Sequence, residues 1–203
     1  MVDPYDVTDY GRSRAELEEY FLFCLAVAGK KAVMIAAKVA EFLKGAAPGE
    51  TPFEYVLRIE REGTLSDRLK EVRLGKYALL EAAYSAAARI GDISAASVEQ
   101  LEALPGVGPK TARFFILHSR RDAKVAVIDT HVLKFLRERG HDVPKGFPTA
   151  QTYRRLEAVM LDEMEASGLS RAEFDLAVWS HYASGGKTPL PAPAAAVRQQ
   201  SAI

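Results

Sequence analysis

Lys110 and Asp129 are the residues of this chain whose types and spacing best suit covalent chemistry. Lys110 lies just inside a predicted helix, and Asp129 follows 19 residues later at the start of another. A neutral amine is a nucleophile that can attack a sugar at C1′ and form a Schiff base. A nearby carboxylate stabilises the positive charge that develops on the sugar, as in glycoside hydrolysis. Taken singly, Lys110 also suits a solvated surface position, and Asp129 suits a helix N-cap.

A glycine-rich turn precedes the lysine. The string Leu104-Pro105-Gly106-Val107-Gly108 lies between two predicted helices. Its glycines allow a tight turn and a close approach to another molecule, and Val107 can fill the space between the helices. Backbone N–H groups at the following helix N-terminus suit a phosphate, so the turn predicts contact with a nucleic-acid backbone. The alternative is a helix corner that uses glycine for its geometry alone.

Helical periodicity dominates the rest of the chain. Apolar residues recur at helical spacing, and Ser, Thr, Pro and Gly mark the ends of the segments. Only the short run 125–128 has the character of a strand. The predicted helices cover residues 16–28, 32–43, 52–60, 77–90, 98–103, 111–118, 129–139, 149–167 and 171–183.

Composition excludes several classes of protein. Lys plus Arg and Asp plus Glu both number 27, so a globally basic coat for nucleic acid is absent and any such contact must be local. The single cysteine, Cys24, lies in an apolar run and is expected in the core. One cysteine cannot hold a four-thiolate iron–sulfur cluster or a cysteine-rich zinc site. No apolar stretch is long enough to span a membrane, and no secretory signal pattern is present.

Two strings together resemble the helix–hairpin–helix–GPD superfamily of DNA glycosylases. They are residues 104–112 (LPGVGPKTA) and 127–131 (VIDTH), whose order and spacing both fit, and the resemblance extends over residues 14–185. It implies an all-α fold with a helix–hairpin–helix motif and two helical lobes that flank a DNA-binding cleft. The implied glycosylase unit is 1–185, with a middle lobe of about 50–135 and another lobe formed from both termini. Residues 186–203 are expected to be a flexible tail.

The resemblance also implies an activity. A lysine at position 110 marks bifunctional glycosylase/AP lyases, which remove a base through a lysine Schiff base and then cleave the strand, and an aspartate at position 129 is essential. The missing cysteine cluster excludes the cluster-bearing branches, so the chain is most similar to the compact 8-oxoguanine DNA glycosylases of base excision repair. The implied partner is double-stranded DNA with a damaged base. No cofactor and no metal are expected, and the protein is expected to be a cytoplasmic, nucleoid-associated monomer.

The last predicted helix carries the candidates for base recognition. Asp175 and Trp179 are four residues apart and share a helical face. A flipped base needs a stacking surface and polar groups for its edge, which Trp179 and Asp175 respectively can supply. The alternative is an amphipathic helix with Trp179 in the core. Phe174 and Val178 are also apolar, and the sequence does not say which face is buried.

Further residues are expected to contact DNA. Lys30 and Lys31 lie at a helix junction that resembles in position the family's gap-filling site, although lysines suit phosphates better than base edges. The alternative for both is a solvated helix end. His131 is a second candidate, with a structural histidine bonded to nearby backbone as its alternative. The turn 73–77 and Arg113, His118, Arg120 and Arg121 are weaker candidates for backbone contacts. The full predicted DNA-binding set is Leu104, Gly106, Val107, Gly108, Thr111, Lys30, Lys31 and His131.

Three other functions stay open at this point. The first is a glycosylase for another modified base, including modifications of foreign DNA. The second is a non-enzymatic helix–hairpin–helix DNA-binding module, which would need neither Lys110 nor Asp129 at this spacing. A metal-dependent nuclease is disfavoured because no carboxylate cluster with ligand spacing stands out.

Overall fold

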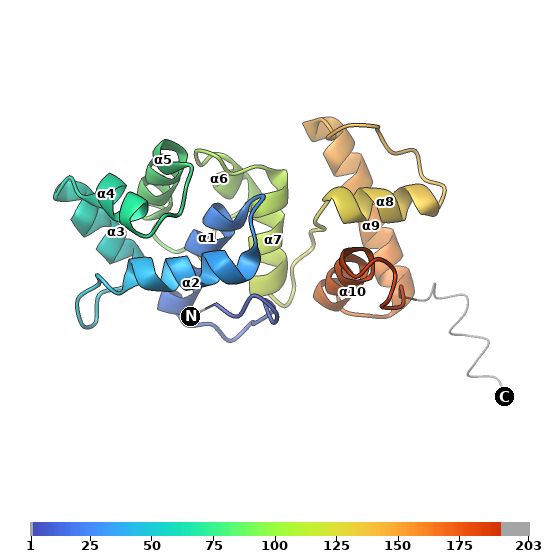
Figure 1. The fold of residues 1–203 in the computed structure, drawn as a ribbon. Coiled ribbons are helices and arrows are strands. Elements are labelled where there is room, and N and C mark those ends of the chain that lie inside the picture. The colour runs from blue at the N-terminus through green and yellow to red at the C-terminus, as the bar shows by residue number, and fades with distance from the viewer. Residues whose placement is uncertain (1, 192–203) are drawn as a thin grey trace. The chain divides into compact units, whose positions relative to one another are not determined.

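The computed structural model describes residues 2–191, and within that range it contains ten α-helices and no strand (Figure 1). The all-α fold class is therefore confirmed. The helices are α1 (Arg14–Val27), α2 (Ala32–Leu43), α3 (Pro52–Arg61), α4 (Leu65–Glu71), α5 (Tyr77–Ala87), α6 (Val98–Glu102), α7 (Pro109–Ser119), α8 (Thr130–Glu138), α9 (Ala150–Ser167) and α10 (Arg171–Ala183).

The chain divides after Arg120 into two compact units, Met1–Arg120 and Arg121–Ile203. In the first unit α1 contacts α2, α3, α5 and α7 (Figure 1). Its apolar side chains are buried around most of its circumference, and the ring of Phe21 meets that of Phe115 edge-on at 4.8 Å. Such a helix needs neighbours on several sides. It therefore packs with the helices that follow it, which differs from the prediction that both termini share one lobe.

Local capping explains where many of these helices begin. A capping box starts four of them, in which a Ser or Thr side chain and a Glu or Gln three residues later each accept a backbone N–H. The N-cap residues are Ser13, Thr51, Ser97 and Ser170. Because these bonds need only four consecutive residues, the boundaries predicted from the sequence agree closely with the structure.

The second unit consists of α8, α9 and α10, and α10 contacts both of the others (Figure 1). Its core includes Phe135, Met160 and Phe174, all of them buried. The run 125–128 enters this core in extended form without a strand partner. Its N–H groups bond to side chains of α9 instead, Ala126 to Glu157 and Ile128 to Tyr153. The run resembles a strand in sequence because it is extended and its side chains are buried.

The packed part of the chain continues past the end of α10. Leu190 packs against the core of the second unit, and an Arg139 guanidinium nitrogen donates to the carbonyl of Pro191 at 3.4 Å. Residues 187–191 are thus not part of a free tail, as the sequence had suggested for 186–203. The remainder of that predicted tail, 192–203, lies outside the described residues.

Candidate nucleic-acid interface and active site

The glycine-rich string forms a turn between α6 and α7. Val107 is buried and its N–H donates to the carbonyl of Leu104 at 3.1 Å. Gly106 is exposed at φ 72°, in the left-handed region that favours glycine. Gly108 is the N-cap of α7 and has no side chain to cap the first N–H groups. The first turn of α7 therefore presents N–H groups that no side chain caps, as an anion site requires.

Arg113 holds the two helices of this hairpin together. It is buried in α7, and its guanidinium forms an ion pair with Glu102 of α6 and also donates to the carbonyl of Pro109. The sequence had suggested Arg113 as a backbone contact to DNA. Its burial and these partners show instead that it stabilises the hairpin.

Two other basic candidates are also structural. His118 is fully buried, and its Nδ1 lies 2.7 Å from the Thr8 hydroxyl. Arg120 donates to the carbonyls of Ile93 and Ala96. Both residues anchor loops of the first unit, so the expectation of direct phosphate contact is wrong for them. Arg121 is exposed, and its contact with DNA stays a prediction.

Lys110 is exposed and lies in the first turn of α7, directly after the hairpin. Thr111, beside it, is half-buried. Lys110 belongs to the first unit and Asp129 to the second.

Asp129 is the N-cap of α8. Its Oδ1 accepts the N–H groups of His131 and Val132, both at 2.9 Å. The predicted capping role is therefore confirmed, and the side chain remains half-buried rather than enclosed. The two hydrogen bonds hold the carboxylate in one orientation at the helix N-terminus, where negative charge is favoured.

Helix α10 settles which apolar face is buried. Phe174 and Val178 belong to the core, whereas Trp179 is 52% exposed. The alternative that Trp179 is a core residue is thus wrong. Asp175, one turn before it, is 5% exposed. Trp179 is an exposed aromatic surface, and Asp175 is a buried polar group on the same helix.

The His131 ring contacts two aromatic side chains of α10. It meets Trp179 edge-on, with ring centroids 6.2 Å apart, and stacks on Tyr182 at 6.1 Å with an interplanar angle of 10°. Tyr182 was not singled out in the sequence. Its position three residues after Trp179, on the same helical face, was the signal that could have identified it.

The junction between α1 and α2 is joined to the turn before α5 by lysine side chains. Lys30 donates to the carbonyl of Leu74, and Lys76 donates to that of Ala28 at 3.2 Å. Partial burial, together with the charges of Lys76 and Lys38, lowers the pKa of Lys30. Lys30 thus has a partner within the chain, whereas Lys31 is exposed. Phosphate contact by either lysine stays a prediction.

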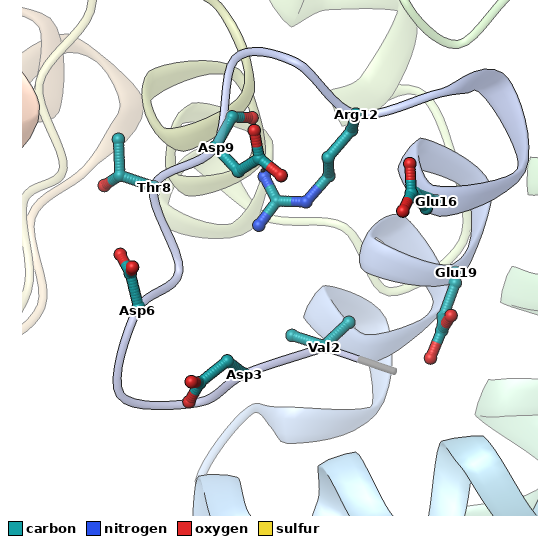
Figure 2. Close-up of a pocket in the computed structure, with 8 residues that line it drawn as sticks. All are labelled: Val2, Asp3, Asp6, Thr8, Asp9, Arg12, Glu16 and Glu19. Carbon is teal, nitrogen blue, oxygen red and sulfur yellow. Dashed lines mark hydrogen bonds between the residues drawn. The ribbon is translucent and has the colours of Figure 1, made fainter.

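A polar cavity of about 430 Å³ lies between the N-terminal loop and the start of α1 (Figure 2). Five carboxylates and one guanidinium, that of Arg12, are among the groups that line it. Such a lining repels phosphates, so this cavity is not a candidate DNA site.

Two absences hold for residues 2–191. No helix there is long and apolar enough to cross a membrane. The same range contains no group of three or more His, Cys, Asp or Glu side chains suited to a metal ion.

Comparison with known proteins identifies a motif and a fold that this chain shares with others. Residues 89–114 match the family model of the helix-hairpin-helix motif. The 8-oxoguanine DNA glycosylase of Methanocaldococcus jannaschii superposes with a TM-score of 0.64 at 23% identity, covering 90% of this chain and 85% of that one. The M. jannaschii 8-oxoguanine glycosylase/lyase in complex with DNA containing 8-oxoguanine gives 0.60, also at 23% identity, covering 88% and 85%.

A bacterial structure agrees with these two. The 8-oxoguanine DNA glycosylase of Thermotoga maritima gives a TM-score of 0.56 at 23% identity, covering 87% of this chain and 83% of that one. The chain therefore contains a helix–hairpin–helix motif within the fold of the compact 8-oxoguanine DNA glycosylases. The predicted resemblance is confirmed at the level of the fold.

Replacing Gly106 with alanine tests the hairpin turn. A Cβ there would lie 2.7 Å from Leu79 Cδ1 in a left-handed conformation. We expect the free energy of unfolding to fall by about 1–2 kcal/mol and affinity for undamaged duplex to fall several-fold, because the N–H groups of the turn move. Urea denaturation and a duplex titration measure the two effects.

Gly63→Ala is the matched control for that variant. Gly63 also has φ 72°, but its added Cβ would meet nothing within 4 Å. It carries the same backbone penalty without disturbing the hairpin, so duplex affinity stays unchanged. Equal loss of affinity in both variants would show that the turn at Gly106 makes no specific contribution to binding.

Proposed function

We propose that this protein is a bifunctional DNA glycosylase/AP lyase that removes 8-oxoguanine from duplex DNA in base excision repair. The observation that carries the proposal is the position of Lys110. It is an exposed amine in the first turn of α7, immediately after a hairpin whose N–H groups suit a DNA phosphate. The fold shared with 8-oxoguanine glycosylases supports the same reaction.

In the proposed reaction, the Nζ of Lys110 gives up its proton and attacks C1′ of the damaged nucleotide. The C1′–N9 bond breaks, and its electron pair leaves with the base, which then takes a proton. The Asp129 carboxylate stabilises the positive charge that develops on the sugar. The amine nitrogen gives up a proton, and its lone pair then forms the C1′=N bond of the protonated Schiff base while the C1′–O4′ bond breaks and O4′ takes a proton. Loss of a C2′ proton then breaks the C3′–O3′ bond, and water releases Lys110 from the sugar product.

Base recognition is assigned to α10. Exposed Trp179 offers a face on which a flipped base can stack, and buried Asp175 offers a carboxylate for the polar edge of the base. The hairpin residues Leu104, Gly106, Val107, Gly108 and Thr111 would position the duplex by contacts to its backbone.

Borohydride trapping over a panel of duplexes, each with a different modified base, tests the activity. We expect a covalent adduct with the 8-oxoguanine duplex that forms equally well in EDTA. Trapping only with another modified base would support the glycosylase/lyase reaction but contradict 8-oxoguanine as its substrate. Absence of any adduct, while DNA is still bound, would favour the non-enzymatic helix–hairpin–helix module.

Trp179→Ala tests the stacking role. Because Trp179 is 52% exposed, its loss should change the free energy of unfolding by less than about 0.5 kcal/mol. Base stacking on an aromatic ring contributes about 1–3 kcal/mol, so we expect single-turnover base release to slow by roughly 5- to 150-fold. Phe147→Ala, which removes an 80% exposed aromatic from the same unit, is the control and should release base normally. Equal rates in the two variants would contradict the role of Trp179.

A further inference from the structure

Trp179, His131 and Tyr182 form a row of three rings in the second unit. Trp179 and Tyr182 come from α10, and His131 comes from the first turn of α8, two residues after Asp129. The His131 ring meets Trp179 edge-on and stacks parallel to Tyr182. These two contacts restrict how far the rings of His131 and Trp179 can turn. An exposed tryptophan without such neighbours would move among several rotamers.

Tyr182 is itself held by α8. Its hydroxyl donates to Glu138 Oε2 at 2.6 Å, and the Lys134 Nζ lies 4.8 Å from the centre of its ring. Burial, reinforced by the bond to Glu138, raises the pKa of Tyr182 to about 12. A phenol is protonated at neutral pH even at its ordinary pKa, so the Tyr182 O–H is available to donate to Glu138. Tyr182 is thus the fixed end of the row, and Trp179 is its exposed end.

We propose that Tyr182 is a positioning residue, which orients the base-stacking face of Trp179 through the imidazole of His131. The inference rests on the proposed function for the role of Trp179, but the mechanical coupling of the three rings does not depend on it. Preorganisation of this kind matters because a binding surface that is already ordered loses less conformational entropy when the base arrives. The same row connects Trp179 to α8, the helix whose N-cap is Asp129. A base stacked on Trp179 would therefore keep a constant position relative to the Asp129 carboxylate.

Tryptophan fluorescence tests the coupling directly, because Trp179 is the only tryptophan in the chain. In the free protein, Tyr182→Ala should add a fast rotation to the time-resolved anisotropy of Trp179. Tyr182→Phe, which keeps the stacked ring and loses only the hydroxyl, should restore most of the wild-type signal. Tyr5→Ala removes an 84% exposed tyrosine from the first unit and controls for lost tyrosine emission. Unchanged anisotropy in Tyr182→Ala would overturn the proposal.

Single-turnover kinetics provide the second readout. We expect Tyr182→Ala to slow release of 8-oxoguanine roughly tenfold, with affinity for undamaged duplex within about twofold of wild type, because only the orientation of Trp179 changes. A loss of affinity equal to the loss of rate would contradict a positioning role. If wild type released no base from any duplex, the proposed function would fail while the anisotropy result still decided the role of Tyr182.

His131→Leu is the safeguard against a folding defect in Tyr182→Ala. It interrupts the row at its centre and leaves the bond between Tyr182 and Glu138 in place. If Tyr182→Ala loses helicity by circular dichroism, increased mobility of Trp179 in His131→Leu supports the coupling. Unchanged mobility in a folded His131→Leu protein overturns it.

Discussion

The Lys110→Gln variant is expected to bind duplex DNA nearly as well as wild type while base release falls by roughly 10³-fold or more and borohydride trapping disappears. Glutamine is close to lysine in length and polar, but its amide is no nucleophile and cannot form a Schiff base. Lys110 is exposed, so the substitution leaves the core and the free energy of unfolding unaffected. The dependence of DNA affinity on salt concentration should weaken by no more than the contribution of one phosphate contact.

Lys44→Gln is the matched control for the loss of one positive charge. Lys44 is an exposed lysine of the first unit at the end of α2, where it forms an ion pair with Glu41. That variant should release and trap the base as wild type does. Trapping that persists in Lys110→Gln would identify another amine as the nucleophile. Binding that collapses in Lys110→Gln would indicate that the lysine serves the duplex rather than the reaction.

The second large effect is expected at Asp129. Asparagine is as good an N-cap as aspartate, so Asp129→Asn keeps the bonds from the His131 and Val132 N–H groups and removes only the charge. We expect single-turnover base release to slow by roughly 10²- to 10³-fold, since a carboxylate that stabilises developing positive charge is lost. The melting temperature should stay close to that of wild type.

Asp129→Ala separates the cap from the charge. It should match the slow base release of Asp129→Asn and also lower the free energy of unfolding by about 1 kcal/mol, because two N–H groups lose their acceptor. Thr149→Ala removes the N-cap of α9 in the same unit and should cost similar stability without slowing base release. If Asp129→Asn were fully active, Asp129 would be a structural cap and not part of the reaction.

The sequence predicted helices best where short-range bonds set their ends. Helices α3 and α10 begin where they were predicted, directly after Thr51 and Ser170, and a capping box holds each start. Helix α2 was also predicted with the boundaries that it has, although no side chain caps its N-terminus. Helix α4 was missed, because it has only seven residues and its buried side chains are Leu65 and Leu69. A segment this short forms no stable helix alone, and packing against α3 and α5 supplies what the local pattern lacks.

The assignment of segments to units also depended on packing. Periodicity shows that α1 is apolar, but it does not identify the helices that cover it. Contacts between residues far apart in the chain placed α1 beside α7 in the first unit, whereas both termini had been predicted to share a lobe. Arg113 and His118 likewise lie in the interior rather than on a DNA-binding surface, because tertiary contacts bury them.

By itself, the sequence determined the parts of the candidate site that depend on a few consecutive residues. The hairpin turn at Gly106, the lysine directly after it and the cap at Asp129 are local, since their geometry follows from backbone conformation and from hydrogen bonds within one helical turn. Only the tertiary structure decided that Trp179 faces outward and that Tyr182 and His131 stack behind it. Helical spacing groups residues on a face, but the packing of α8 and α9 against α10 decides which face is covered.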